Sequence, residues 1–144
     1  MADKTKLAAP KTVTISTLLD LKRKGVKITM LTAYDFPTAR LAEEAGVDVI
    51  LVGDSVGMTK LGYESTLPVT IDEMVHHTKA VKRGLSRALL VADMPYLSYE
   101  VDLKEAVRNA GRLLKEGGAH AVKVEGGMEV ASTIKEFLKI NVPV

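Results

Sequence analysis

Short apolar runs alternate with longer segments of helical character through most of this 144-residue sequence. The apolar runs cover residues 28–34, 47–52, 89–92 and 119–124, and predicted helices stand between them at 36–45, 70–83 and 102–114. Apolar runs of this kind indicate strands buried on both faces, and a helix between successive strands indicates a parallel sheet. Such an α/β repeat closes into a barrel or forms a doubly wound sheet, and periodicity alone does not decide between them.

The number of repeats favours half of a barrel. A helix is predicted over residues 14–25 before the first strand, another over 128–138 after the fourth, and residues 141–144 resemble the start of a fifth strand. A closed (β/α)8 barrel typically needs about 250 residues. We therefore expect a polar leader over residues 1–13 and the N-terminal half of one barrel domain over residues 14–144.

Composition narrows the classes of partner. The absence of cysteine excludes disulfide frameworks, thiolate metal sites and cysteine nucleophiles. The net charge is only +2, and residues 1–27 hold seven Lys or Arg against two acids, so nucleic acid is not an expected partner. No apolar run approaches the roughly 20 residues of a membrane-spanning helix. We expect no membrane partner and a cytoplasmic location.

Acidic residues stand where the predicted strands end. Asp35, Asp54, Asp93 and Glu125 each follow one of the four apolar runs. The carboxyl ends of parallel strands share one face of the fold, so these carboxylates are expected to converge there. Several hard oxygen ligands without His or Cys suit Mg²⁺ or another hard divalent cation. The pattern favours a metal-assisted reaction.

Each of these residues also has a purely structural interpretation. For Asp35 we favour it, because Phe36-Pro37 begins a helix directly after it and Asp is a good helix N-cap. For Asp54 and Asp93 we favour function, since the next helices begin several residues later. Glu125 could be a solvated turn residue, but Lys123 two positions earlier would share its face of the strand, and an inward lysine is unusual.

Two other features are weaker. His76 and His77 are adjacent on a predicted helix, about 100° apart, which is typical of partly exposed side chains rather than paired ligands. The long connection over residues 57–70 is expected to be an extended loop that serves as a lid, a substrate wall or an oligomer contact. The sequence lacks the glycine-rich patterns typical of nucleotide sites.

Five motifs taken together resemble the ketopantoate hydroxymethyltransferase family, also called 3-methyl-2-oxobutanoate hydroxymethyltransferase. They are TAYD (32–35), LVGDSVGM (51–58), GYESTLPVT (62–70), ADMP (92–95) and VKVEGG (122–127). The resemblance extends over residues 14–144 and implies a TIM barrel of the phosphoenolpyruvate/pyruvate type. It implies transfer of a one-carbon unit from 5,10-methylenetetrahydrofolate to 3-methyl-2-oxobutanoate on the route to pantothenate, and a large homo-oligomer, a decamer in the family.

The resemblance also implies roles for particular residues. Asp54, Asp93 and Glu125 match the family's metal-site carboxylates, and Ser55 and Lys123 match the groups that hold the keto acid. Because an α-keto acid chelates Mg²⁺, Asp54 and Asp93 also belong to the substrate site. The metal would stabilise the enolate that forms when the adjacent carbon loses its proton.

The resemblance places a substrate-contacting His and the general-base Glu beyond Val144. We therefore expect a truncated chain with no catalytic base of its own. Two other hypotheses stay open: another Mg²⁺-dependent α-keto acid enzyme of the phosphoenolpyruvate mutase/isocitrate lyase group, against which the motif at 62–70 argues, and a non-catalytic half-barrel.

Overall fold

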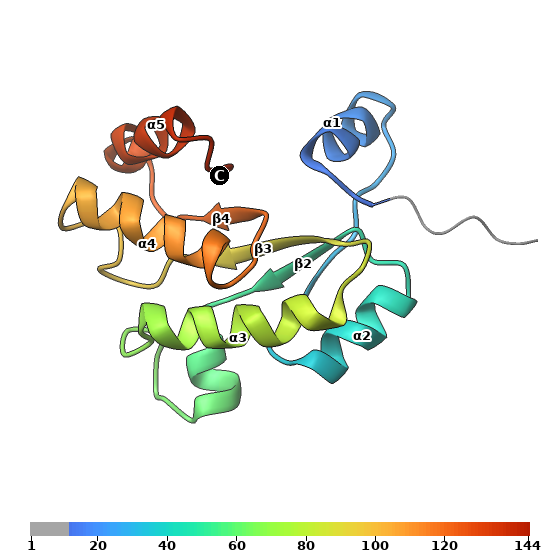
Figure 1. Cartoon of the computed structure of the whole chain (residues 1–144), viewed down its shortest axis with the longest axis horizontal. Coiled ribbons are helices and arrows are strands. Elements are labelled where there is room, and N and C mark those ends of the chain that lie inside the picture. Colours follow the sequence, from blue (N-terminus) through green and yellow to red (C-terminus); the bar gives the residue numbers. More distant parts are fainter. Residues whose placement is uncertain (1–11) are drawn as a thin grey trace, which may run out of the picture.

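The computed structural model describes residues 12–144 as a parallel sheet with helices packed against it (Figure 1). The four strands lie in sequence order: β1 (Met30–Thr32), β2 (Val49–Val52), β3 (Leu89–Asp93) and β4 (Ala121–Lys123). Their register places Asp93 opposite Lys123, so two strand-end residues of opposite charge are neighbours. Four parallel strands connected by helices form half of a (β/α)8 barrel.

Five α-helices accompany the sheet: α1 (Ile15–Arg23), α2 (Phe36–Glu44), α3 (Ile71–Gly84), α4 (Leu103–Lys115) and α5 (Ala131–Lys139). Helices α2 to α5 pack against one another in sequence order, whereas α1 stands apart from these four helices (Figure 1). The helix predicted over 128–138 begins instead with a 3-10 turn, Met128–Val130, before α5.

Side-chain caps begin four of these helices, α1 to α4. The Thr70 hydroxyl accepts the Glu73 amide while the Glu73 carboxylate accepts the Thr70 amide, which is the predicted capping box of α3. Asp102 caps α4 by accepting the amides of Lys104 and Glu105. Such caps satisfy backbone donors that the first helical turn leaves without partners.

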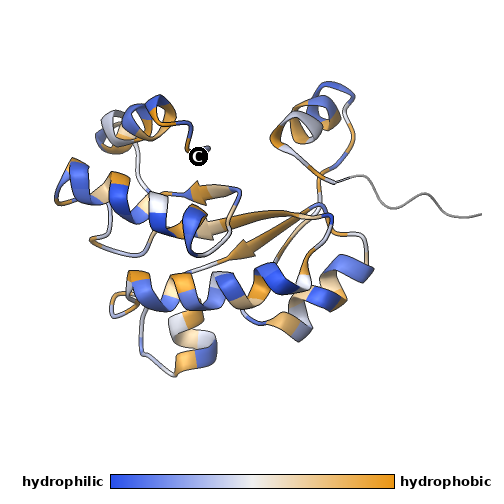
Figure 2. Cartoon of the chain, viewed as in Figure 1, coloured by the Kyte–Doolittle hydropathy of each residue, from blue (hydrophilic) through white to orange (hydrophobic). Residues whose placement is uncertain are grey.

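The two faces of β2 and β3 are packed differently. Ile50 and Leu90 face the helices and are fully buried in the main core. Val49 and Leu89 belong to a smaller cluster that also contains Val13. The strands are accordingly apolar up to their carboxyl ends, while the helices carry many polar residues (Figure 2). Of the predicted polar leader, all but Thr12 and Val13 lies outside the described residues.

Strand β1 departs from the prediction of full burial. Met30 is 47% exposed and Leu31 53% exposed. Within the described residues β1 pairs only with β2, so it is an edge strand of this sheet. At the opposite edge the Val122 amide donates to the Pro143 carbonyl at 3.0 Å, which is the beginning of the pairing expected for a fifth strand.

The connection between β2 and α3 is not wholly extended, contrary to the prediction. It contains one π-helical turn, Gly57–Leu61, which ends at Gly62 in the left-handed conformation, with φ +76°. Gly57 is buried, and a Cβ there would lie 2.5 Å from Val69 Cγ2. Glycine is therefore required for this close approach. Among residues 12–144, none of the helices is long and apolar enough to cross a membrane.

Candidate active site

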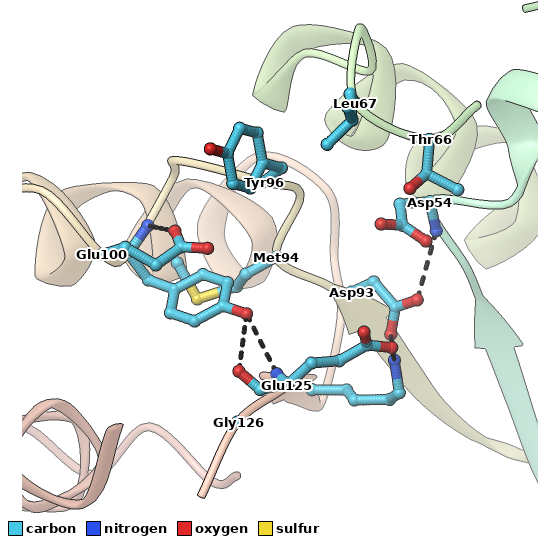
Figure 3. A pocket seen from close by; sticks show the side chains of 11 residues that line it. Asp54, Thr66, Leu67, Asp93, Met94, Tyr96, Glu100, Glu125 and Gly126 are labelled. Atoms are coloured by element: carbon cyan, nitrogen blue, oxygen red, sulfur yellow. Dashed lines mark hydrogen bonds and ion pairs between the residues drawn. The ribbon is translucent and has the colours of Figure 1, made fainter. Parts of the chain in front are cut away.

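A pocket of about 400 Å³ opens at the carboxyl ends of β2, β3 and β4. It is lined by residues from these strand ends and from the connections that follow them: Asp54, Thr66, Leu67, Asp93, Met94, Tyr96, Tyr99, Glu100, Lys123, Glu125 and Gly126 (Figure 3). Four of the five residues predicted for the site, Asp54, Asp93, Lys123 and Glu125, therefore lie around one cavity. Ser55 is not among its lining residues.

Asp93 lies at the base of this pocket and is 4% exposed. Its Oδ2 atom accepts the Asp54 amide at 3.1 Å, which joins the ends of β3 and β2. Its Oδ1 atom is buried, and although Lys123 Nζ lies 3.0 Å away, it makes no well-oriented hydrogen bond. Burial raises the pKa of the Asp93 carboxyl against the opposing effect of Lys123.

Lys123 occupies the space between two of the carboxylates. Its Nζ atom lies 3.0 Å from Asp93 Oδ1 and 2.8 Å from Glu125 Oε1. Burial opposes the charge of Lys123, but the hydrogen bond with Glu125 and the nearby negative charge of Asp93 outweigh it and raise the lysine pKa. The same hydrogen bond with Lys123 lowers the pKa of Glu125. Lys123 is therefore a cation at neutral pH.

Asp54 completes the acidic wall of the pocket. Its side chain is half-buried, and burial, together with the negative charge of Glu125, raises its pKa. Glu100 also lines the pocket, so four carboxylates face one ammonium group. An excess of negative charge in a partly buried site favours binding of a cation.

Sequence reasoning did not single out Tyr99. Its side chain is 6% exposed, and its hydroxyl donates to the Glu125 carbonyl at 2.9 Å and accepts the Glu125 amide at 3.0 Å. Burial raises the pKa of this hydroxyl, so it keeps its proton at neutral pH. Thr66 and Leu67 belong to the connection over 57–70, for which a substrate wall was one of the expected roles. Tyr96 and Glu100 were likewise missed as lining residues, because connections have no periodicity that predicts where their side chains point.

Ser55 and the histidines do not line the pocket. The Ser55 hydroxyl and the Tyr34 hydroxyl are 2.8 Å apart. His77 Nδ1 contacts the Tyr34 carbonyl at 2.8 Å and is half-buried, whereas His76 is exposed. Among residues 12–144, no three His, Asp or Glu side chains stand close enough together to form a ready metal-ligand set.

Asp35 is a helix cap, as its sequence context predicts. Its carboxylate accepts the Thr38 amide at 2.9 Å at the start of α2 and pairs with Lys60 at 3.1 Å. The bond to Thr38, aided by Lys60, lowers the pKa of Asp35 to about 2. Asp35 is outside the lining of the pocket, so the four strand-end acids divide into one cap and three pocket residues.

Replacing Asp35 by alanine is expected to lower the free energy of unfolding by about 1 kcal/mol at pH 7, because α2 loses its cap. The folded pKa of about 2 is below the ordinary value of 3.8. The stabilisation is therefore complete above pH 3.8 and lost as the pH falls toward 2. Urea unfolding of D35A and wild type from pH 2 to 7 measures this difference in the free energy of unfolding. D20A, which removes an exposed helical acid paired with Arg23, is the control; a D35A effect that did not change with pH would contradict this assignment.

The sequence matches the family model of ketopantoate hydroxymethyltransferase over residues 12–144. It is 57% identical over 132 residues to the 3-methyl-2-oxobutanoate hydroxymethyltransferase of Thermoanaerobacter sp. (strain X514), covering 92% of this chain and 48% of the relative. It is 62% identical over 132 residues to the enzyme of the same name from Koribacter versatilis, covering 92% of this chain and 45% of the relative. The chain thus spans about half the length of these curated relatives.

Solved structures resemble the fold at lower identity. A 2,3-dimethylmalate lyase, described as a PEP mutase/isocitrate lyase superfamily member, superposes with a TM-score of 0.65 at 15% identity, covering 93% of this chain and 51% of that one. Phosphonopyruvate hydrolase, in a complex with oxalate and Mg²⁺, gives 0.59 at 18% identity, covering 73% and 36%. These likenesses confirm the half-barrel architecture. The family match and the identity to its curated relatives show that the chain belongs to the ketopantoate hydroxymethyltransferase family.

Proposed function

We propose that residues 14–144 are the N-terminal half of one barrel domain, and that they supply the cation- and keto-acid-binding part of a 3-methyl-2-oxobutanoate hydroxymethyltransferase. The observation that carries this proposal is the gathering of Asp54, Asp93, Lys123 and Glu125 around one pocket in a chain of this family. The whole enzyme would transfer a one-carbon unit from 5,10-methylenetetrahydrofolate, as a cytoplasmic homo-oligomer in pantothenate synthesis.

The pocket offers the carboxylate oxygens that suit a hard divalent cation such as Mg²⁺, although its three acids would have to move closer together, or act through water, to share one ion. Carboxylate oxygens are its preferred ligands, and Asp93 Oδ1 is buried without a hydrogen bond. We assign Asp54, Asp93 and Glu125 to hold the cation. When bound, it supplies positive charge that stabilises an enolate. The phosphonopyruvate hydrolase of similar fold was crystallised with Mg²⁺ and the dicarboxylate oxalate, which is consistent with this assignment.

The remaining residues have roles toward the keto acid. Lys123 carries the one ammonium group among the lining residues and would attract the carboxylate and the oxyanion that develops beside it. Ser55, whose hydroxyl already meets Tyr34, would donate to the substrate carboxylate. Asp93 accepts the Asp54 amide, and this hydrogen bond fixes the position of the Asp54 backbone relative to the Asp93 carboxylate. We assign no general base to this chain.

Calorimetric titration of 3-methyl-2-oxobutanoate into the protein tests the proposal. We expect binding in the presence of Mg²⁺ and loss of most of the affinity when EDTA removes the cation, because chelation by the keto acid needs it. Equal affinity with and without Mg²⁺, or no binding with it, would contradict the proposal. Oxalate in the same titration tests the wider phosphoenolpyruvate mutase group: a site that takes oxalate but not the branched keto acid would favour that alternative.

Lys123→Met separates the two ligands. It removes the ammonium that would hold the keto acid, and a charge-assisted hydrogen bond of about 1.5–3 kcal/mol corresponds to at least a tenfold loss of keto-acid affinity. The same change frees Asp93 and Glu125 from their ion pairs, so affinity for Mg²⁺ alone is expected to stay equal or rise. K139M, at an exposed lysine of α5 paired with Glu136, is the matched control. Parallel loss of both affinities in K123M would contradict these roles.

A further inference from the structure

Tyr99 is joined to the end of β4 by two hydrogen bonds from one atom. Its hydroxyl contacts both the amide and the carbonyl of Glu125, at 3.0 and 2.9 Å, and Figure 3 draws the two contacts beside Glu125. Tyr99 itself lies in the connection between β3 and α4 and belongs to the main hydrophobic core. The hydroxyl therefore ties the peptide of Glu125 to a buried, fixed ring.

These two hydrogen bonds matter because Glu125 makes few other contacts. Its side chain is 74% exposed, and Lys123 is its hydrogen-bonding partner. The next residue, Gly126, has φ +143°, a backbone conformation that residues with a side chain rarely adopt. The direction in which the Glu125 carboxylate leaves the strand is set mainly by its own backbone, and Tyr99 fixes that backbone.

We propose that Tyr99 is a positioning residue whose hydroxyl fixes the Glu125 peptide and thereby holds the Glu125 carboxylate over the pocket, beside Lys123. The inference rests on the proposed function where it concerns the cation. It is independent of that function where it concerns the ion pair between Glu125 and Lys123, which the structure contains.

Tyr99→Phe tests this by removing the hydroxyl and keeping the buried ring. We expect affinity for Mg²⁺ to fall about tenfold, in the range found when groups that orient a metal ligand are removed. Tyr63→Phe is the matched control, because the Tyr63 hydroxyl donates to Glu73 at 2.5 Å in the capping box of α3 and Tyr63 does not line the pocket. Y63F should leave Mg²⁺ affinity unchanged, and thermal melts of both variants check that the fold is kept.

Two NMR measurements need no metal. In Y99F the Glu125 amide should exchange faster with solvent, and the ¹⁵N signal of the Lys123 ammonium group should shift as its partner moves; in Y63F neither should change. A faster amide with an unchanged Lys123 signal and unchanged Mg²⁺ affinity would overturn the proposal, since the hydroxyl would then hold the turn without positioning the carboxylate. If wild type bound no Mg²⁺, the proposed metal function would fail, and the Lys123 signal alone would decide the role of Tyr99.

Discussion

Replacing Asp93 by asparagine is expected to weaken Mg²⁺ binding at least about 100-fold, equivalent to roughly 2.7 kcal/mol. Asn keeps the shape of the side chain and an oxygen that can accept the Asp54 amide, but it removes the charge from the most buried carboxylate of the pocket. Binding of 3-methyl-2-oxobutanoate should be lost with the cation. Calorimetric titration of Mg²⁺, with and without the keto acid, measures both effects.

The stability of D93N sharpens this test. Burial raises the pKa of Asp93, so the folded chain holds this carboxylate charged at a cost that appears as the pH rises above its ordinary value of 3.8. The neutral amide removes that cost, and D93N should melt no lower than wild type at pH 7. Asp35→Asn is the matched control, because Asn also caps helices and residue 35 lies outside the pocket. A D35N variant that lost Mg²⁺ affinity, or a D93N variant that kept it, would contradict the assignment of Asp35 to the helix cap and of Asp93 to the cation site.

The site was largely predictable because strand ends in a parallel sheet share one face. Largely apolar runs located β2, β3 and β4, and the acids that follow these runs, Asp54, Asp93 and Glu125, line one pocket. Helix signals were equally informative: the Pro at position 37 explained why Asp35 caps α2 instead of joining the pocket. In each case a local rule about caps or strand ends fixes where the side chain lies.

Other features depend on contacts between distant parts of the chain. The two bonds of Tyr99 to Glu125 join residues 26 apart, and no local pattern marks Tyr99 as different from Tyr96 beside it. The exposure of β1 was missed because an apolar run indicates that a strand is suited to burial. It does not reveal whether another element packs against that strand, and β1 is an edge strand. The π-helical turn at Gly57–Leu61 depends on packing of Gly57 against Val69, which sequence spacing does not reveal.

Residues 1–144 alone are expected to show no hydroxymethyltransferase turnover, because the pocket supplies anchoring groups and the resemblance places the general base in the half of the relatives that this chain does not span. Supplying the remaining half of the Koribacter versatilis relative as a separate polypeptide should restore turnover. The exposed apolar side chains of β1, Met30 and Leu31, are the surface that a neighbouring strand would cover. Formation of the ketopantoate product from 3-methyl-2-oxobutanoate and methylenetetrahydrofolate, by purified polypeptides separately and mixed, is the measurement.

Two variants of the first half separate assembly from chemistry in this mixture. D93N should associate with the second half as wild type does, because the substitution does not prevent the barrel from closing. It should give no turnover, because the pocket then lacks the buried carboxylate assigned to hold the cation. Leu31→Lys should bind the second half more weakly, since a charge on β1 opposes burial of that strand against its neighbour, and turnover should recover when the second half is added in excess.

Turnover by residues 1–144 alone near the typical enzyme value of about 10 s⁻¹ would mean that a residue of this chain acts as the base. Glu100, the one lining carboxylate without an assigned role, would then be the first to replace by glutamine.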